Sequence, residues 1–325
     1  MKHDLSAMEY RQLGNTELKL STIGFGCWAM GGSWGKIDDK ESIEAARSAI
    51  DKGINFFDTA DVYGFGHSES TLAKALGSKR KNVIIATKGG LVWDDHGCLF
   101  RSGSRRHLMN ALEASLRRLK TDYIDLYQIH WPDTNTPFDM TMKVLDEMKK
   151  SGKVRYVGVS NFTRKQIVEC LKSGDVNSLQ PPYNLFMRGI DKDFSFCRRN
   201  GIGIVAYGPL AYGLLTGKFN KTSKFPENDW RSGRLFPDPG DWQAHIDLFH
   251  GDRFKKYLGI VEKLKKIAQR LGKTVSQLSI AWVLSNHAVT SAIVGAKRPS
   301  QLEENLGGVG WELSKHDLIE INRIV

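Results

Sequence analysis

The chain has 325 residues, of which 41% are hydrophobic and 26% are charged, and its formal net charge is +11. These values are ordinary for a globular protein that buries a core. No apolar run approaches the roughly 20 residues that a transmembrane helix requires. The first eight residues include Asp4 and lack the apolar stretch of a signal peptide. We therefore expect a cytoplasmic protein without a membrane partner.

The basic residues are dispersed rather than gathered in an arm or a stripe. The densest groups, at 79–81, 105–106 and 265–266, fall in predicted loops or on helix faces. Such charges are typical of solvated surfaces, so we expect no nucleic-acid partner, although a few of them could attract an anionic cofactor. The widely separated cysteines predict neither disulfides nor a metal site (Cys27, Cys98, Cys170 and Cys197).

The predicted elements begin with a β-hairpin, because residues 10–20 alternate polar and apolar side chains around Gly14-Asn15. A unit of roughly 30 to 45 residues then recurs, in which a short apolar run is followed by an amphipathic stretch. The apolar runs predict strands at 22–25, 55–57, 83–87, 124–128, 156–159, 178–180, 203–207 and 292–294. The amphipathic stretches predict helices at 41–52, 105–119, 138–151, 164–173, 253–271 and 275–285.

Strands that alternate with helices predict a parallel sheet with helical crossovers. Eight such units without an interruption favour an α/β fold of the (β/α)₈ TIM-barrel type, as one domain over residues 1–325. We expect the N-terminal hairpin to cover the N-terminal mouth of the barrel. The stretch 212–252, after the seventh strand, has little periodicity, and loops of that length are usually functional, so we interpret it as a lid.

Polar side chains follow nearly every predicted strand. In such barrels, chemistry takes place at the carboxyl ends of the strands. We therefore expect these side chains to share one site, at Asp58, Lys88, His130, Ser160, Asn161, Gln180, Tyr207 and Lys297.

Three of these residues, Asp58, Lys88 and His130, suggest acid–base chemistry together with Tyr63, in the loop after Asp58. Tyr63 would be the proton donor, but a free phenol has a pKa of about 10. A nearby cation favours the phenolate, so we expect Lys88 to lower the pKa of Tyr63 and Asp58 to keep Lys88 charged. His130 would orient the substrate oxygen. The set predicts a tyrosine acid aimed at a carbonyl.

The same residues carry a resemblance to the aldo-keto reductase superfamily, and especially to the bacterial inositol-utilisation type and the potassium-channel β subunits. Its motifs run along essentially the whole chain in the family's order: Asp58-Thr-Ala-Asp-Val-Tyr63-Gly, Thr87-Lys88, Asp122-Tyr-Ile-Asp-Leu126 leading into His130-Trp, Gly158-Val-Ser-Asn-Phe162, Gln180, Tyr183-Asn184, Gly213-Leu-Leu-Thr-Gly-Lys218, Gly295-Ala-Lys297 and Glu304-Asn305. The resemblance implies an NADPH-dependent oxidoreductase that interconverts a small carbonyl compound and an alcohol. It also implies Tyr63 as general acid, within a tetrad with Asp58, Lys88 and His130.

The resemblance further implies where NADPH binds, without a Rossmann fold. Ser160, Asn161 and Gln180 would bind the nicotinamide amide, and Tyr207 would stack on its ring. The pyrophosphate would lie along 207–213 with Lys218, and Arg231 is a weaker candidate there. Lys297, Gln301, Glu304 and Asn305 would hold the adenosine end near a predicted helix start. The expected cofactor residues are thus Gly26, Trp28, Ser160, Asn161, Gln180, Tyr207, Gly208, Pro209, Leu210, Gly213, Lys218, Arg231, Gly295, Lys297, Gln301, Glu304 and Asn305.

This sequence has Gln301 where many members of the family have Arg, although Lys297 and Arg298 remain available to a 2′-phosphate. Trp28, Trp93 and Trp131 follow strands and are expected to wall the substrate pocket. Seven further histidines show no metal-ligand spacing and are interpreted as surface residues, so no metal is expected: His67, His96, His107, His245, His250, His287 and His316.

Two other functions compete with a reductase. One is a regulatory protein that holds NADPH with little turnover, as the resemblance to the channel β subunits suggests; those relatives tend to have Asn at the position of His130, which argues against it. The other is a Schiff-base enzyme with Lys88 as nucleophile, which would leave Tyr63, Gln180 and Tyr207 unexplained.

Overall fold

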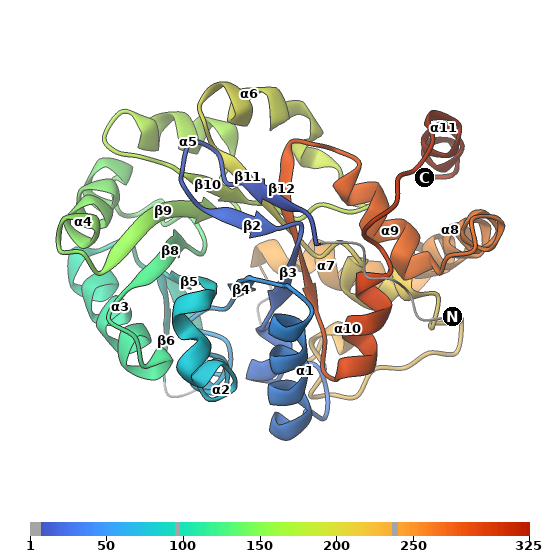
Figure 1. Cartoon of the computed structure of the whole chain (residues 1–325), viewed down its shortest axis with the longest axis horizontal. Helices are drawn as coiled ribbons and strands as arrows, with labels where there is room; N and C mark the ends of the chain where they lie inside the picture. Colours follow the sequence, from blue (N-terminus) through green and yellow to red (C-terminus); the bar gives the residue numbers. More distant parts are fainter. Residues whose placement is uncertain (1–7, 95–97, 236–239) are drawn as a thin grey trace.

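The computed structural model describes residues 8–94, 98–235 and 240–325. Within these ranges, eight parallel strands close into a barrel in the order β10-β11-β12-β3-β4-β5-β8-β9, and helices surround it (Figure 1). The predicted TIM barrel is therefore confirmed. The barrel strands are β3 (Ile23–Gly26), β4 (Phe56–Asp58), β5 (Ile84–Gly89), β8 (Ile124–Ile129), β9 (Val154–Ser160), β10 (Ser178–Gln180), β11 (Gly203–Tyr207) and β12 (Val289–Gly295).

Each predicted strand is present, but β12 begins three residues before the predicted start. Thr290 and Ser291 interrupt the apolar pattern there, and yet both are buried. The Ser291 hydroxyl donates to the carbonyl of Ser21 at 2.8 Å, so its burial is compensated by a hydrogen bond.

Five of the ten principal helices that the structure describes around the barrel start at side-chain caps. The carboxylate of Asp38 accepts two backbone N–H groups at the first of them, and Thr163 and Thr274 form capping boxes. The ten helices are α1 (Asp39–Asp51), α2 (His67–Leu76), α3 (Arg105–Leu119), α4 (Phe138–Lys150), α5 (Arg164–Leu171), α6 (Phe194–Arg199), α8 (Gly251–Arg270), α9 (Val275–Leu284), α10 (Pro299–Leu306) and α11 (Lys315–Ile324). Those with side-chain caps are α1, α3, α5, α9 and α11. None of the helices in the described ranges has the length and apolar character needed to cross a membrane.

The helix α2 was not predicted, because most of its side chains are buried regardless of their polarity. Ser68, Glu69 and Thr71 are fully buried in its first turns. A helix that buries polar groups shows no apolar stripe, which is the signal that sequence periodicity relies on. Its burial places it directly beneath the loop that follows β4.

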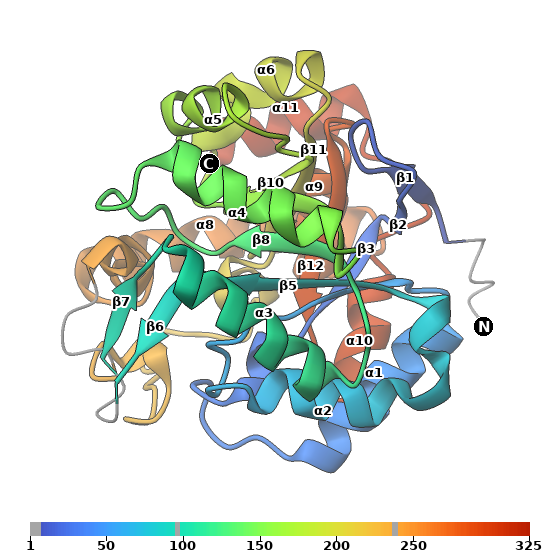
Figure 2. The ribbon, with the colours of Figure 1, turned by 90° about the vertical axis from the view of Figure 1, so that its left-hand side faces the viewer.

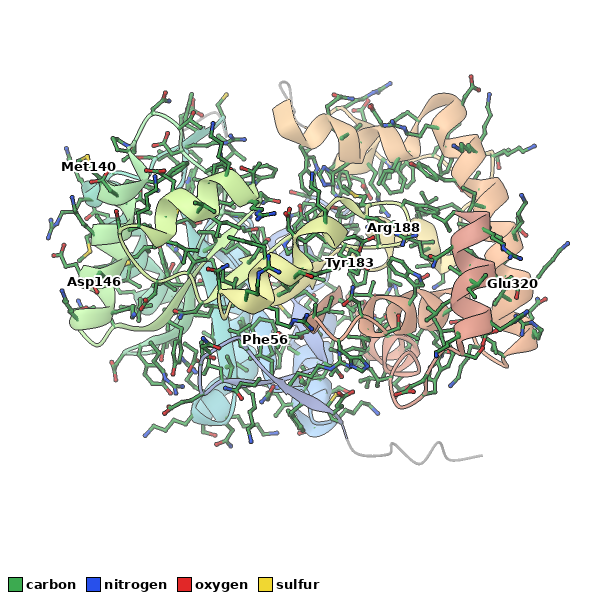
Figure 3. All side chains as sticks on the ribbon, turned by 90° about the horizontal axis from the view of Figure 1, so that it is seen from above. Phe56, Met140, Asp146, Tyr183, Arg188 and Glu320 are labelled. Atoms are coloured by element: carbon green, nitrogen blue, oxygen red, sulfur yellow. The ribbon has the colours of Figure 1, made fainter. Side chains whose placement is uncertain are left out.

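The N-terminal hairpin closes one end of the barrel, as predicted. Strands β1 (Tyr10–Gln12) and β2 (Lys19–Ser21) pair in antiparallel orientation. Leu13, Leu18 and Leu20 are buried in one cluster with residues from inside the barrel, among them Phe56. Phe56 lies centrally in Figure 3, whereas the labelled Met140 and Asp146 of α4 and Glu320 of α11 lie at the outside.

The opposite end of the barrel carries a second hairpin and the predicted lid. Strands β6 (Leu91–Trp93) and β7 (Leu99–Arg101) form a hairpin that was not predicted. Figure 2 shows it on the side of the molecule away from β1 and β2. The lid has short helical turns at Ala211–Thr216, Trp230–Ser232, Gly240–Trp242, Gln243–Ile246 and Asp247–Phe249.

The lid is attached to the loop that follows β3. Trp34 and Asp229 form an antiparallel bridge, and the N–H of Trp230 donates to the carbonyl of Ser33 at 3.0 Å. Trp230 is fully buried. These contacts hold the lid across the carboxyl ends of the strands.

Candidate active site

A buried ion pair lies at the carboxyl ends of β4 and β5. Lys88 is fully buried, and its Nζ lies 2.7 Å from Oδ1 of Asp58. The ammonium also donates to the carbonyl of Thr59 at 2.8 Å and to the hydroxyl of Tyr63 at 3.4 Å. All three donors of the ammonium therefore have partners, which is what burial of a charge requires.

The second carboxylate oxygen of Asp58 is also satisfied. Nε2 of Gln180, at the end of β10, donates to Oδ2 of Asp58 at 2.8 Å. Gln180 was expected to bind the nicotinamide amide. In this structure its amide nitrogen binds Asp58, and its backbone carbonyl accepts hydrogen bonds from the Ser160 hydroxyl and the Asn161 N–H.

The expected effect of Lys88 on Tyr63 is wrong for this structure. Desolvation, followed by the charges of Asp58, Cys27 and Asp61, raises the pKa of Tyr63 well above its usual value. Lys88 forms an ion pair with Asp58, so its positive charge does not outweigh the effect of desolvation on the pKa of Tyr63. Tyr63 is consequently a protonated phenol through the neutral range, which suits a proton donor.

His130 completes the group, edge-on to Tyr63. The two ring centroids are 5.6 Å apart, with an interplanar angle of 80°. Burial, and next the charge of Lys88, lower the pKa of His130 well below its usual value. The imidazole is therefore neutral near pH 7, so one ring nitrogen carries a proton and the other can accept one.

A close backbone approach holds the loop that carries Tyr63. Gly64 has a φ of 60°, and a Cβ at this position would lie 2.4 Å from the carbonyl oxygen of Gly31. Only glycine fits both conditions. The approach lets Trp28 stack on Tyr63, with ring centroids 6.0 Å apart and an interplanar angle of 28°.

These residues lie at the wall of a cavity of about 1280 Å³. Tyr63, Asp58 and His130 line it, whereas Lys88 lies behind the wall. Every residue that the sequence assigned to the cofactor lines the same cavity, from Gly26 to Asn305. The volume exceeds the several hundred Å³ that are typical of a small-molecule pocket.

Amide and hydroxyl groups line the part of the cavity next to the tetrad. The hydroxyl of Tyr207 donates to Oδ1 of Asn161 at 2.8 Å. Nδ2 of Asn161 donates to the carbonyl of His130 at 3.0 Å. Asn161 has a φ of 64°, a left-handed conformation that asparagine adopts more readily than most residues. The region is thus rigid and rich in hydrogen-bonding groups.

Basic residues line the part of the cavity near α10. Lys297 donates from Nζ to the carbonyl of Trp34 at 2.6 Å, and its backbone N–H donates to Oε1 of Gln301 at 2.7 Å. Arg298 and Lys218 are exposed on the rim. Arg231 forms two hydrogen bonds to the carboxylate of Asp229, which makes it a component of the lid as well as of the wall.

The expected substrate wall is brought together only in part. Trp28 and Trp131 line the cavity, and the guanidinium of Arg101 lies over the Trp131 ring at 5.1 Å. Trp93 is not among the lining residues and instead contacts Phe65, which is one of them, at 5.5 Å between ring centroids. Sequence reasoning missed Leu91, Leu99 and Arg101 because it did not predict the β6–β7 hairpin, and it also missed Phe65, in the loop between β4 and α2.

The expectation that the other histidines are surface residues is wrong for His245. This residue is 5% exposed and stacks on Trp242 at 3.9 Å between ring centroids. Burial lowers the pKa of His245 to about 4, so it is neutral near pH 7. His107 is half-buried, and His96 lies outside the described residues.

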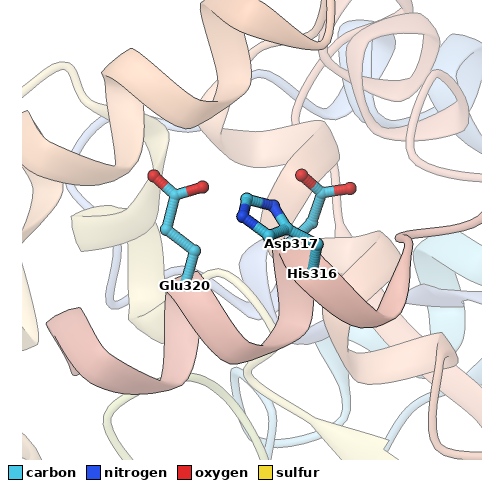
Figure 4. Close-up of side chains that lie close together, drawn as sticks. All are labelled: His316, Asp317 and Glu320. Carbon is cyan, nitrogen blue, oxygen red and sulfur yellow. The ribbon is translucent and has the colours of Figure 1, made fainter.

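One cluster on α11 has side chains close enough to hold a cation, namely His316, Asp317 and Glu320 (Figure 4). Nη2 of Arg270 already lies 3.0 Å from Asp317 and 2.5 Å from Glu320. The arginine therefore supplies the positive charge that these two carboxylates need, and we assign no metal to them.

Comparison with known proteins agrees with the fold and identifies the family. The model of the Aldo/keto reductase family matches residues 22–325, so the chain belongs to this family and is an oxidoreductase. Members of the family use nicotinamide cofactors and act on small molecules.

Relatives match the chain over nearly its full length. Aldo-keto reductase YhdN of Bacillus subtilis is 41% identical over 323 residues, which are 98% of this chain and 94% of that protein. A probable voltage-gated potassium channel subunit beta of Arabidopsis thaliana is 35% identical over 93% of this chain and 91% of its own. The solved structure of the glycerol dehydrogenase AKR11B4 from Gluconobacter oxydans superimposes with a TM-score of 0.86 and 36% identity, over 97% of this chain and 94% of its own.

The buried ion pair makes a direct prediction about stability. Lys88→Met leaves the carboxylate of Asp58 buried without its cation, and breaking such a pair costs about 3–5 kcal/mol. Urea unfolding at neutral pH measures this loss. The double variant Lys88→Met/Asp58→Asn removes the stranded charge and should recover part of it.

Lys143→Met is the matched control, because it removes an exposed pair with Asp139 on α4. We expect this variant to unfold close to the wild-type midpoint. A Lys88→Met protein as stable as the control would contradict a charged, buried Lys88–Asp58 pair.

Proposed function

We propose that this protein interconverts an aldehyde, ketone or sugar with the corresponding alcohol, with NADPH as its cofactor and Tyr63 as the proton donor. The observation that carries the proposal is the hydroxyl of Tyr63 in the cavity wall, 3.4 Å from the buried ammonium of Lys88. A phenol in that position can protonate a carbonyl oxygen at neutral pH.

The residues along the cavity fit a dinucleotide in chemistry and extent. Hydrogen-bonding groups of Ser160 and Asn161 lie beside the tetrad and would hold an amide-bearing ring, on which Tyr207 would stack. Lys218, Lys297 and Arg298 lie toward the rim and suit phosphate groups. When bound, the nicotinamide supplies the hydride in reduction and accepts it in oxidation.

The first turn of α10, which has no side-chain cap, supports the proposal that a phosphate group of the cofactor binds there. The helix has eight residues, Arg298 at its N-cap makes no side-chain cap, and Pro299 occupies the first turn. Pro299 has no N–H, and those of Gln301 and Leu302 donate to the carbonyl of Arg298. The N–H of Ser300 is therefore the group of this turn that would meet an anion. Ser300 and Gln301 of this turn line the cavity.

The chain's own groups would manage the proton. Tyr63 is protonated because its pKa is raised, and it can donate to an oxygen that gains negative charge. The Lys88 ammonium would then stabilise the phenolate that remains, because it lies within hydrogen-bonding distance of that oxygen. A neutral His130 can donate a hydrogen bond to the same substrate oxygen and so fix its position.

The alternative is a regulatory protein that binds NADPH with little turnover, a reading suggested by the potassium-channel relative. A substrate panel run in both directions distinguishes the two functions. It measures the consumption of NADPH with aldehydes, ketones and sugars, and the formation of NADPH from NADP⁺ with the alcohols. Turnover in either direction supports the reductase. Tight NADPH binding with no turnover on the whole panel would favour the regulatory protein.

Tyr63→Phe tests the proton donor. The variant keeps the ring and its packing on Trp28 but lacks the hydroxyl. We expect turnover to fall by about 10²–10⁴-fold, the usual contribution of general acid catalysis, and the affinity for NADPH to remain. Steady-state kinetics and a fluorescence titration of the cofactor provide the two numbers, and near-normal turnover would remove Tyr63 from the mechanism.

Lys297→Ala/Arg298→Ala tests the choice of cofactor. These residues follow β12 on the cavity rim and have the charge that a 2′-phosphate needs. We expect the KM for NADPH to rise far more than the KM for NADH, because NADH lacks that phosphate. An equal rise for both cofactors would place the 2′-phosphate elsewhere.

A further inference from the structure

A second group of buried polar residues lies behind the carboxyl end of β5, and the proposed chemistry does not use it. It comprises residues from the loop after β4, from α2, β5, α3 and β8, namely Asp61, Glu69, Thr87, Arg118 and Tyr127. Asp61 lies between Asp58 and Tyr63 in the sequence, and Thr87 precedes Lys88. The group therefore includes residues from the two segments that carry Asp58, Tyr63 and Lys88.

Glu69 is a fully paired carboxylate. It accepts from the hydroxyl of Thr87 at 2.6 Å and forms an ion pair with Nε of Arg118 at 2.6 Å. Glu69 is entirely buried, while the side chain of Arg118 is 23% exposed. One cation and one carboxylate thus balance each other at this place.

Asp61 is the unbalanced member. It is 1% exposed, and neither of its carboxylate oxygens has a hydrogen-bond partner among the described residues. Its backbone N–H donates to the carbonyl of Lys88 at 3.3 Å. A buried ionised carboxylate without a donor is costly, whereas a protonated carboxylic acid is not charged and can itself donate.

Two glycines make room for the group. A Cβ on Gly89 would lie 2.0 Å from the hydroxyl oxygen of Tyr127, and a Cβ on Gly66 would lie 2.5 Å from Cδ of Arg118. Tyr127 is fully buried, and its hydroxyl has no partner among the described residues. The fold thus brings a second carboxyl and a phenol against the Glu69–Arg118 pair.

The charges that face Asp61 come from each neighbouring element. Burial, and next the negative charge of Glu69, raise the pKa of Asp61 well above its usual value, against the charge of Arg118, the nearby backbone N–H of Val62 and the charge of Lys88. Tyr127 faces the same group, and burial, with the charges of Asp61 and Glu69, raises its pKa also. A negative charge on Asp61 in turn raises the pKa of Tyr63.

We propose that Asp61, buried without a donor to either carboxylate oxygen, is held as a neutral carboxylic acid behind the tetrad and on ionising opposes the loss of the Tyr63 proton. The second half of this inference rests on the proposed role of Tyr63. Asp61 is not among the residues that line the cavity, so it would act through its charge on the phenol.

The first test is the pH profile of alcohol oxidation, in which Tyr63 must accept a proton. Asp61→Asn keeps the shape of the side chain and cannot ionise. We expect the alkaline rise in kcat to occur at a lower pH than in the wild type, by about half a unit or more, because one negative charge near the phenol is gone. An unshifted profile would overturn the electrostatic role.

The control is Asp125→Asn. Asp125 is as buried as Asp61, but it is paired with Arg80 and Arg155 and accepts the N–H of Ile85 near the start of β5. The substitution should lower the thermal stability by weakening these pairs. It should leave the pH profile of turnover where it is, which separates general destabilisation from the specific effect of Asp61.

The second test needs no substrate. Above about pH 4 the unfolded chain loses the Asp61 proton while the native protein keeps it, so this group makes the wild type less stable as pH rises toward the raised native pKa. Asp61→Asn removes that loss. We expect the Tm of the variant minus the Tm of the wild type to become more positive between pH 4 and pH 7.

A constant Tm difference would mean that Asp61 is ionised in the native protein and would overturn the proposal. If Asp61→Asn does not fold, Glu69→Gln replaces it. Removing the negative charge of Glu69 should lower the native pKa of Asp61, so the fall of Tm that Asp61 causes should end at a lower pH than in the wild type. A fall that ends at the same pH would overturn the proposal. An inactive wild type with a widening Tm difference would refute the proposed function, while leaving the neutral Asp61 in place.

Discussion

The burial of a lysine ammonium at the end of a barrel strand is the constraint on which the site depends. Lys88 has no access to solvent, so every donor of its Nζ must find a partner inside the protein. Asp58, the carbonyl of Thr59 and the hydroxyl of Tyr63 supply these partners. The position of the tyrosine is therefore set by the needs of a buried charge as well as by the packing of its ring.

This constraint also explains the protonation states around it. Because Lys88 is paired with Asp58, its charge does not outweigh desolvation, which keeps Tyr63 a phenol. Lys88 and burial together keep His130 neutral. The result is a site that holds two uncharged proton-bearing groups at one wall of a large cavity, which is the state in which a carbonyl can be reduced.

The barrel could be predicted from the sequence because its strands are short apolar runs with turn residues between them, and because polar residues follow the strands in register. Asp58, Lys88 and His130 follow from the same pattern, since the carboxyl ends of parallel strands meet. Tyr63 lies in the loop beyond β4 and is identified from its chemistry and the family motif. The β6–β7 hairpin could not be predicted, because Leu99 and Phe100 lie in an exposed three-residue strand with no alternation to mark it. The helix α2 was missed for the opposite reason: its polar residues are buried and erase the stripe.

Electrostatics was the part that the sequence could not provide. From residue types alone, Lys88 beside Tyr63 predicts a lowered phenol pKa, yet the outcome depends on whether the lysine is already paired and on how much water reaches the ring. The role of Asp61 depends in the same way on α2, which brings Glu69 beside it. The pKa of such a buried group depends on burial and on charges from several elements, and no local sequence pattern predicts these.

The most direct test of this account is the ionisation of Tyr63 itself in the protein without cofactor. A difference titration of ultraviolet absorbance, wild type minus Tyr63→Phe, isolates the phenolate signal of this one residue. The account predicts no phenolate from Tyr63 up to pH 10, the usual pKa of the side chain, because its pKa is raised in the folded protein. A phenolate that appears near neutral pH would contradict it, and would show that Lys88 acts on the tyrosine as an uncompensated cation.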